Sequence, residues 1–399
     1  MFDRVKDVNH PEEDLLSVYR DHGVVRRDGR DDNFNKAALD RSIYQLVHPG
    51  WLVVNRMKAW QGSVGISPFR GIVSGHYICF RPAHHENDRF LNWLLRSAPY
   101  TAEYAALSRG VRPNQVEIDN EWLRSLRIML PPLEEQRRIA DFLDAETARL
   151  DRLAVAMHKQ DDLLKHRRLR VLDLLGDVGT QPKKARLGYL SLLVTSGSRG
   201  WSEYIADSGE LFFRSANLHA DRIQPKLANT AYVQIPESEA TEGQRARIKR
   251  GDVLIGITGA NAGWVCLADD AVANGYVSQH VCLVRPDSSR LNSRWLALLA
   301  ASTSVQSELM RSQYGGTKTQ LSLPDVRAIR VPVLPVERQA QLALSVERRI
   351  ESLDRQRALR QRQLQLLTER RQALITAAVT GQFDVTTASG RNVTEGVAV

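Results

Sequence analysis

The feature that most constrains the fold of this chain is an internal repeat about 200 residues long. The stretch Leu126–Gln136 matches Ile329–Gln339, which lies 203 positions later. Two more matches precede it in each half, in the same order: Gly50–Val54 with Gly251–Ile255, and Val73–Pro82 with Val277–Pro286. Collinear matches indicate a duplicated domain, and the long period excludes a solenoid of short repeats.

Each half ends in a stretch that has the period of a coiled coil. Residues 134–175 contain neither Pro nor Gly, and apolar residues recur there every seven positions. The same set of positions recurs 203 residues later, where all of them are apolar except Arg360. Its apolar members, which we expect to pair the helices, are Leu143, Leu150, Met157, Leu164, Val171, Val346, Leu353, Leu367 and Leu374. Such heptads predict two helices of about 60 Å in antiparallel coiled-coil contact. The alternative is a helix that merely covers its own domain.

The globular part of each half mixes strands with helix. In the second half, residues 251–257 and 277–284 read as strands around a loop rich in glycine, and residues 291–309 have helical spacing. We therefore predict an α/β (α+β) fold in which two similar globular domains alternate with two long helices. The expected domains are residues 1–130, helix 131–178, residues 179–333, helix 334–380 and a flexible tail 381–399.

Charge favours a polyanionic partner. The chain has 55 Lys and Arg against 46 Asp and Glu, a net charge of +9, and such a balance suits phosphate contacts. The sequence contains no run of 18 apolar residues, so it does not predict a membrane span. The start of the chain does not have the pattern of a targeting segment. The chain has three cysteines without paired spacing, Cys79, Cys266 and Cys282. This sparse use of cysteine favours a cytoplasmic location.

Catalytic motifs are missing from the sequence. Residues 315–319 lack the upstream glycine of a phosphate-binding loop, and Gly256, Gly259 and Gly263 do not have dinucleotide-site spacing. The Asn-Pro-Pro-aromatic motif of amino-methyltransferases is also absent. His84 and His85 hint at a metal site only weakly, since isolated surface histidines are far commoner. We predict no catalytic residue, metal or cofactor in this chain.

Candidate DNA contacts lie in loops. Arg56, Lys58, Trp60 and Gln61 combine charge, an aromatic ring and an amide, which contact phosphates and base edges. Further candidates, in a second loop and after the helices of the two domains, are Arg199, Trp201, Arg109, Arg112, Lys318, Thr319 and Gln320. The alternative is that Trp60 anchors a core and Arg56 is a solvated charge. The matched residues His76 and His280 read as packed strand residues or as polar contacts to DNA.

Several of these segments resemble one protein family. Residues 131–140 and 374–384 are similar to the start of the first and the end of the second conserved helix of type I restriction-modification specificity subunits. Residues 54–62 resemble a segment common in the target-recognition domains of the family. The likeness covers nearly the whole chain. It departs at the start, where residues 18–23 already match the stretch at Phe212, so an opening element of about 20 residues looks absent from the first domain.

The resemblance implies a non-catalytic subunit that binds double-stranded DNA and reads two different half-sites. It also implies two methyltransferase (modification) subunits and restriction/translocase subunits as partners, which would supply the S-adenosylmethionine, ATP and Mg²⁺ chemistry. Two other readings remain open. One is a coiled-coil scaffold or regulatory DNA-binding protein with degenerate domains, and the other is a fused nuclease or methyltransferase.

Overall fold

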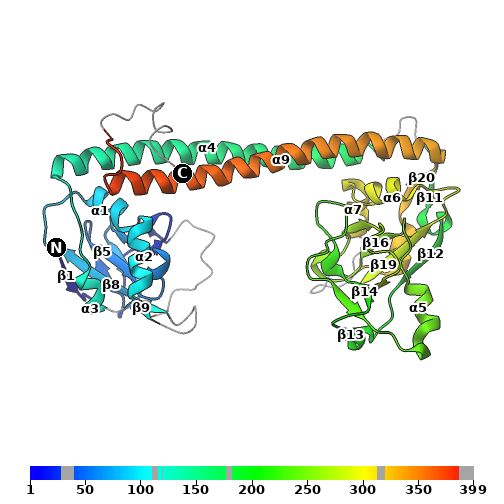
Figure 1. Ribbon diagram of the computed structural model, residues 1–399, viewed down its shortest axis with the longest axis horizontal. Coiled ribbons are helices and arrows are strands. Elements are labelled where there is room, and N and C mark those ends of the chain that lie inside the picture. The colour runs from blue at the N-terminus through cyan, green and yellow to red at the C-terminus, as the bar shows by residue number, and fades with distance from the viewer. Residues whose placement is uncertain (28–39, 110–115, 119, 177–181, 312–319, 386–399) are drawn as a thin grey trace. The chain divides into compact units, whose positions relative to one another are not determined.

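The computed structural model describes residues 1–27, 40–109, 116–118, 120–176, 182–311 and 320–385, and the chain divides into two units. Unit 1 consists of residues 1–157 and 361–399, and unit 2 of residues 158–360. The long helices α4 (Leu133–Asp173) and α9 (Val336–Val379) each contribute to both units. Figure 1 labels several elements of each unit. Among the described residues, no helix is long and apolar enough to cross a membrane.

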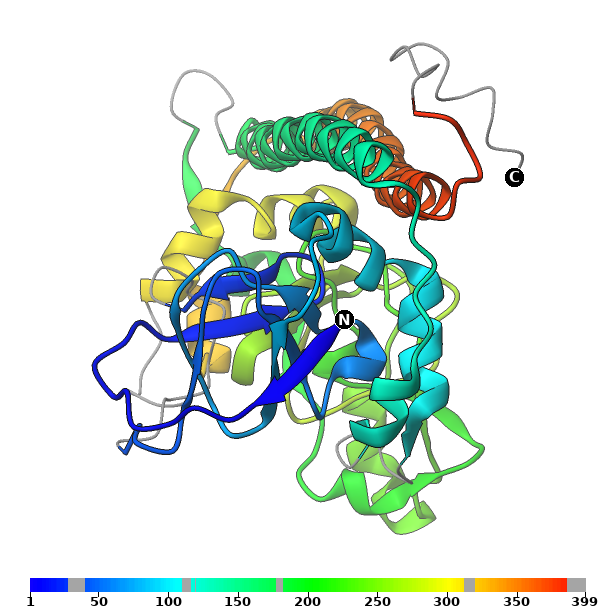
Figure 2. The same ribbon diagram turned by 90° about the vertical axis from the view of Figure 1, so that its left-hand side faces the viewer.

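Unit 1 is built on a four-stranded sheet of order β1-β8-β5-β6. Antiparallel pairs join β1 to β8, β8 to β5 and β5 to β6. Its elements before α4 are β1 (Phe2–Val5), β2 (Leu16–Tyr19), β3 (Gly23–Arg26), β4 (Gln45–Val47), β5 (Leu52–Asn55), the 3-10 helix η1 (Ala59–Gln61), β6 (Val64–Ile66), β7 (Gly71–Val73), β8 (Tyr77–Pro82), α1 (Asp88–Leu95), α2 (Ala98–Leu107), β9 (Ser108–Arg109), β10 (Glu117–Ile118) and α3 (Asn120–Ser125). Figure 2, which faces unit 1, shows α1 between the strands and the two long helices.

Unit 2 repeats this sheet in the order β12-β19-β16-β17. The elements between α4 and α9 are β11 (Lys184–Arg186), η3 (Leu187–Leu190), β12 (Ser191–Ser196), η4 (Trp201–Tyr204), β13 (Ile205–Ala206), β14 (Glu210–Phe213), η5 (Ser215–Asn217), β15 (Ala231–Val233), η6 (Glu237–Glu239), α5 (Ala240–Ala246), β16 (Val253–Gly256), η7 (Gly259–Asn261), β17 (Val265–Leu267), β18 (Tyr276–Val277), β19 (Val281–Pro286), α6 (Ser293–Ala300), α7 (Thr303–Arg311), α8 (Leu323–Ala328) and β20 (Arg330–Pro332). Strands with the same place in the two sheets are offset by 201 residues for β5 and β16 and by 204 for β8 and β19. The predicted duplication and the mixed α/β fold class are confirmed.

The prediction that unit 1 lacks its opening element needs correction. Strand β1 pairs with β8 as β12 pairs with β19, so the first strand of the sheet is present. Within the described residues, unit 1 has no counterpart of β11, which pairs with β20 in unit 2. The stretch equivalent to β20 runs through Met129, whose side chain is 86% exposed, whereas the matching Pro332 is buried. The sequence comparison overestimated the gap because β1 and β12 share no recognisable residues.

The helix predicted over residues 291–309 is two helices. Helix α6 ends at Ala300 and α7 begins at Thr303. The Ser302 hydroxyl donates to the carbonyl of Leu299 at 2.6 Å, and Asp173 accepts from the backbone N–H of Thr303 at 2.8 Å. Because the start of α7 is capped in this way, apolar spacing that continues from α6 into α7 does not make one helix.

The two long helices run antiparallel within each unit. In unit 2, Arg168 Nε lies 3.2 Å from Asp354 Oδ1, and Arg357 Nε lies 3.1 Å from Asp161 Oδ1. In unit 1, Arg371 lies 3.4 Å from Asp151. Of the residues predicted to pair the helices, Leu143, Leu150, Met157, Val346, Leu353 and Leu374 are buried, and Leu164, Val171 and Leu367 are half-buried. The interrupting Arg360 donates a hydrogen bond to Gln160 on the facing helix.

A buried glutamine attaches each sheet domain to its long helix. Gln136 accepts from the backbone N–H of Asn87 at 3.0 Å and donates to the carbonyl of Pro131 at 2.8 Å and to Glu86 at 2.6 Å. Gln339 accepts in the same way from Asn292 at 2.8 Å. Both Asn side chains cap the following helix, α1 or α6. The repeated Gln therefore joins a helix N-cap to the long helix in both units.

Candidate nucleic-acid interface

Three segments meet beyond the end of β5 in unit 1. The backbone N–H of Arg56 donates to the carbonyl of His76 at 3.0 Å, and the N–H of Ile118 donates to the carbonyl of Arg56 at 3.1 Å. The Arg56 guanidinium also lies 3.0 Å from the Glu117 carboxylate. We call this meeting of the β5 end, the turn before β8 and the strand β10 the three-segment junction.

Unit 2 has the same junction in the same hydrogen-bonding arrangement. The N–H of Ile257 donates to the carbonyl of His280 at 3.0 Å, and the N–H of Leu321 donates to the carbonyl of Ile257 at 2.8 Å. Thr258 forms an isolated bridge with Gln320. Because backbone bonds hold these segments, the side chains that project from them are free to differ without loss of the framework.

The side chains at the two junctions are indeed different. Unit 1 exposes Arg56, Lys58 and His76. Unit 2 exposes His280 and Gln320, and the Thr258 hydroxyl lies 2.7 Å from His280 Nδ1. The first junction therefore presents two cations, and the second presents hydroxyl, imidazole and amide groups, which can form hydrogen bonds with base edges.

Some of the predicted DNA contacts come together at these junctions. Arg56 and Lys58 lie at the first, Gln61 is exposed at the end of η1, and the backbone of Arg109 pairs with Glu117. Gln320 lies at the second junction. Arg199 is exposed two residues after Gly197, whose N–H donates to the carbonyl of Ser278 at 3.3 Å. The remaining candidates Arg112, Lys318 and Thr319 lie outside the described residues.

The two tryptophans belong to the interior and not to an exposed loop. Trp201 is 1% exposed, its indole N–H donates to Glu239 at 2.6 Å, and its ring meets Tyr276 edge-on. A ring that is enclosed in this way cannot stack on or read a base, so the prediction for Trp201 is wrong. Trp60 is half-buried, and its N–H donates to the carbonyl of Met57 at 3.1 Å. Its ring lines a cavity against α2, which agrees with the alternative that Trp60 is an anchor.

Sequence reasoning also misplaced the two matched histidines. The favoured interpretation was packing within a strand, but His76 and His280 are exposed in the turns before β8 and β19. The apolar runs on both sides suggested continuous strands. The signal that could have placed them is Gly75 beside His76, because glycine is typical of a turn.

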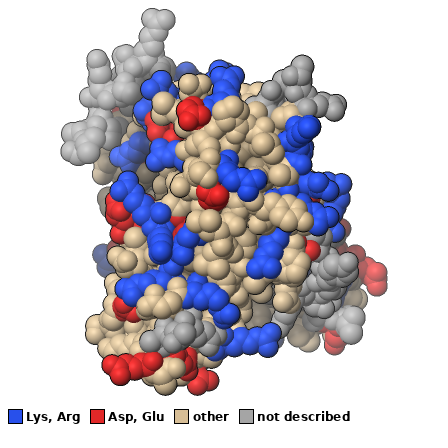
Figure 3. All heavy atoms as spheres, turned by 90° about the vertical axis from the view of Figure 1, so that its right-hand side faces the viewer, with Lys and Arg blue, Asp and Glu red and all other residues tan. Residues whose placement is uncertain are grey.

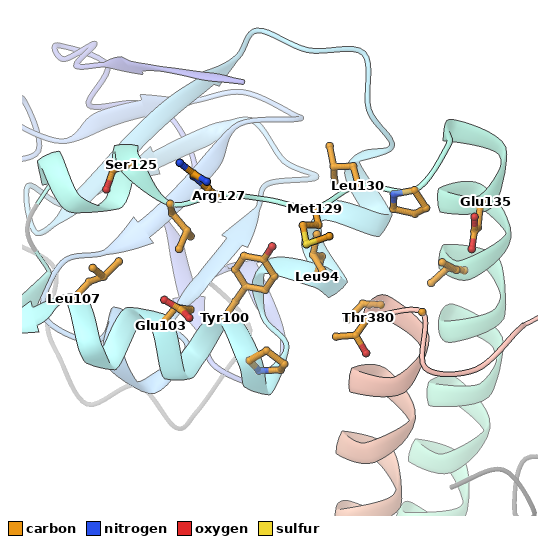
Figure 4. A pocket seen from close by; sticks show the side chains of 16 residues that line it. Leu94, Tyr100, Glu103, Leu107, Ser125, Arg127, Met129, Leu130, Glu135 and Thr380 are labelled. Carbon is orange, nitrogen blue, oxygen red and sulfur yellow. The ribbon is translucent and has the colours of Figure 1, made fainter.

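A second feature of unit 1 is an apolar groove of about 730 Å³. Figure 4 shows side chains from α2, from the stretch before α4 and from the ends of both long helices around it, with Tyr100 and Met129 near its centre. Its charged lining residues are Glu103, Glu135 and Arg127. Largely apolar walls with more acidic than basic groups do not suit a DNA backbone, so this groove is not part of the candidate interface.

The electrostatics of unit 2 suit a polyanion. Figure 3 shows Lys and Arg side chains spread over the face of unit 2 seen there, with fewer Asp and Glu. Strands β11 and β20 carry exposed Arg186 and Arg330 directly opposite each other. Neighbouring cations without an intervening carboxylate favour phosphate binding.

The structure offers little for metal or thiol chemistry. The described residues contain no group of three or more His, Cys, Asp or Glu side chains able to hold a metal ion. The three cysteines are buried and free. Burial raises the pKa of the thiols of Cys79 and Cys282 to about 12, which keeps them protonated and unreactive near neutral pH.

Comparison with known proteins gives a domain match in the first half of the chain and a fold for nearly all of it. Residues 24–158 match the family described as Type I restriction modification DNA specificity domain. No curated protein matches the chain. A chain from a structure on complex assembly and conformational transition of the type I R-M system is 15% identical, with a TM-score of 0.72 and coverage of 95% of this chain and 94% of that one. The HsdS subunit from Thermoanaerobacter tengcongensis is 18% identical, with a TM-score of 0.53 and coverage of 96% and 94%.

At these identities the structural matches establish the fold. The family match at residues 24–158 is a match of sequence, and it spans most of the first domain and the first part of α4. Residues 24–158 therefore resemble a type I restriction modification DNA specificity domain, and the chain as a whole has the fold of the matched structures.

Proposed function

We propose that this chain chooses the DNA sequence on which a type I complex acts, by reading a bipartite, asymmetric target with one junction for each half-site. This proposal is supported by the match of residues 24–158 to a type I restriction modification DNA specificity domain. In this proposal the chain has no catalytic residue and no cofactor of its own. The alternatives of a scaffold or a fused nuclease or methyltransferase are not favoured.

The observation that carries the proposal is the contrast between the two three-segment junctions. Their backbone hydrogen bonds agree, but Arg56 and Lys58 in unit 1 correspond to Ile257 and Gly259 in unit 2. Base readout depends on a few side chains, and each well-made pair contributes about 1–3 kcal/mol of discrimination. Two frameworks with different side chains should therefore read different bases, which makes a palindromic target unfavourable.

The proposal includes partners that the chain itself does not contain. Two methyltransferase subunits and restriction/translocase subunits would supply S-adenosylmethionine, ATP and Mg²⁺ chemistry, while this chain would position them on double-stranded DNA. Cellular DNA as the target, together with three buried free thiols, supports a cytoplasmic location for the complex. The coiled-coil helices α4 and α9 would hold the two recognition domains in one subunit.

The test exchanges side chains at one junction and reads both half-sites. Gln320→Ala removes an exposed amide from the second junction without touching the core. In complex with the methyltransferase subunits, we expect the methylated sites to become degenerate at one position of one half-site. The expected loss of discrimination is about 5- to 150-fold, as follows from 1–3 kcal/mol. Lys58→Ala should affect only the other half-site.

A matched control separates recognition from general effects. Arg137→Ala removes an exposed cation that pairs with Glu134 on α4, away from both junctions in sequence. It should leave the methylated sequence unchanged. A palindromic target, or an effect of Gln320→Ala on both half-sites, would contradict the division of labour. Methylation by the purified chain without partner subunits would contradict its non-catalytic role.

A further inference from the structure

Unit 1 contains a small cavity of about 290 Å³ with an unusual lining of arginine and tryptophan. Arg20 follows β2, Arg96 follows α1, and Arg371 comes from α9. Trp60 and Trp93 complete the aromatic part of the wall, and the Thr101 side chain adds a hydroxyl. We call it the arginine cavity.

Two guanidinium groups share one aromatic ring in this cavity. The Cζ atoms of Arg96 and Arg371 each lie 5.8 Å from the centre of the Trp93 ring. The ring is held in place because its indole N–H donates to Asp144 at 2.8 Å. Arg96 is also held, since one of its terminal N–H groups donates to the carbonyl of Arg20 at 3.1 Å. The two cations therefore converge on a rigid support.

These cations are poorly compensated by the protein. The Nε atoms of Arg96 and Arg371 are buried and have no hydrogen-bond partner. Asp21 also lines the cavity, but it is exposed, and within the described part of the chain neither Arg20 nor Arg96 forms an ion pair with it. The Asp151 carboxylate lies 3.4 Å from Arg371 Nε, but it is 62% exposed and not aligned for a hydrogen bond. Burial, and then the charge of Arg371, lower the pKa of Arg96 to about 10, although the nearby negative charge of Asp21 acts in the opposite direction. Arg96 therefore remains charged at neutral pH.

The equivalent place in unit 2 is an internal comparison. Arg371 corresponds to Arg168, 203 positions earlier, and the residue that ends α6 where Arg96 ends α1 is Ala301. Both line a cavity there, of about 470 Å³. Its cations are paired, because Arg168 contacts Asp354 and Arg357 contacts Asp161 and Asp221. The repeat therefore tolerates alanine at the Arg96 position, so Arg96 is not required by the fold.

We propose that the arginine cavity binds a phosphate group through the guanidinium groups of Arg96 and Arg371. A phosphate offers several acceptor oxygens and a negative charge, which meet the unpartnered N–H groups and reduce the repulsion between the arginines. The Thr101 hydroxyl and the exposed Arg20 can add to the site. The phosphate belongs either to a DNA backbone or to a free oxyanion, and the experiment below distinguishes these sources.

The first measurement is the thermal unfolding midpoint of the full chain in phosphate and in chloride at equal ionic strength and pH. A tenfold excess of inorganic phosphate over its Kd should raise the midpoint by about 3–6 °C. Arg96→Ala should abolish this rise. In chloride it should leave the midpoint unchanged or higher, because it removes a repulsive buried charge. The matched variant in unit 2, Arg168→Ala, should lower the midpoint in both buffers and keep the response to phosphate.

The second measurement is DNA affinity as a function of salt concentration. If the phosphate belongs to DNA, Arg96→Ala should weaken binding to any duplex about 3- to 10-fold and reduce the salt slope by about one. If it is a free oxyanion, the phosphate response disappears while DNA affinity is unchanged. The proposal is overturned if the wild type and Arg96→Ala respond alike to phosphate and bind DNA alike. Loss of base specificity alone would count against the proposed function and leave this site intact.

Discussion

The buried glutamine that ends the repeated motif should stabilise each unit separately. Gln136→Ala deletes an acceptor for the Asn87 N–H and a donor to the Pro131 carbonyl and to Glu86. Gln136 is fully buried, so water cannot replace the partners without entering the contact. A buried group left without its hydrogen bond costs about 1–3 kcal/mol. With two backbone groups affected, we expect about 2–5 kcal/mol of destabilisation in unit 1.

Hydrogen exchange followed by peptide mapping can assign this loss to one unit. In Gln136→Ala, amides of α1 should exchange faster, since this helix is capped by Asn87, and those of α6 should not change. Gln339→Ala should give the reverse pattern, because it bonds to Asn292 in the same way. Arg137→Ala, one residue along α4, removes only an exposed ion pair and should change stability by less than about 1 kcal/mol. A loss below 1 kcal/mol in Gln136→Ala, or equal changes in both units, would refute the reasoning.

Three further outcomes follow from burial in the structure. Asp252→Ala should destabilise unit 2 by about 3–5 kcal/mol in urea unfolding, because it strands the guanidinium of Arg285, which bonds both carboxylate oxygens at 2.9 and 2.7 Å; a change under 1 kcal/mol would contradict this. Trp201→Ala should lower the free energy of unfolding of unit 2 by a similar amount. Trp201→Phe should keep most of the DNA affinity once it is folded. A specific loss of base readout by the folded Trp201→Phe variant would restore Trp201 as a DNA contact. The three buried thiols should resist iodoacetamide at pH 8 and react only after unfolding, as mass spectrometry would show; rapid labelling of the native chain would count against their burial.

The sequence by itself determined the repeated architecture of this protein. Duplication leaves matching residues at constant offsets, and the heptad column of α4 and α9 depends only on spacing along one helix. These are local patterns, so they can be read without knowing which segments meet in space. For the same reason the absence of known catalytic motifs could be assessed from the chain alone. The sequence did not reveal strand β1, because β1 and β12 have the same place in their sheets but no residues in common.

Only the tertiary structure decided which side chains face solvent and which meet each other. Trp201 looked like a loop residue, but Tyr276 and Glu239, distant in sequence, enclose it. His76 and His280 looked like strand residues, but each lies in an exposed turn. The convergence of Arg96 and Arg371 on Trp93 joins residues some 275 positions apart. Burial and proximity depend on long-range contacts, which a linear pattern does not encode.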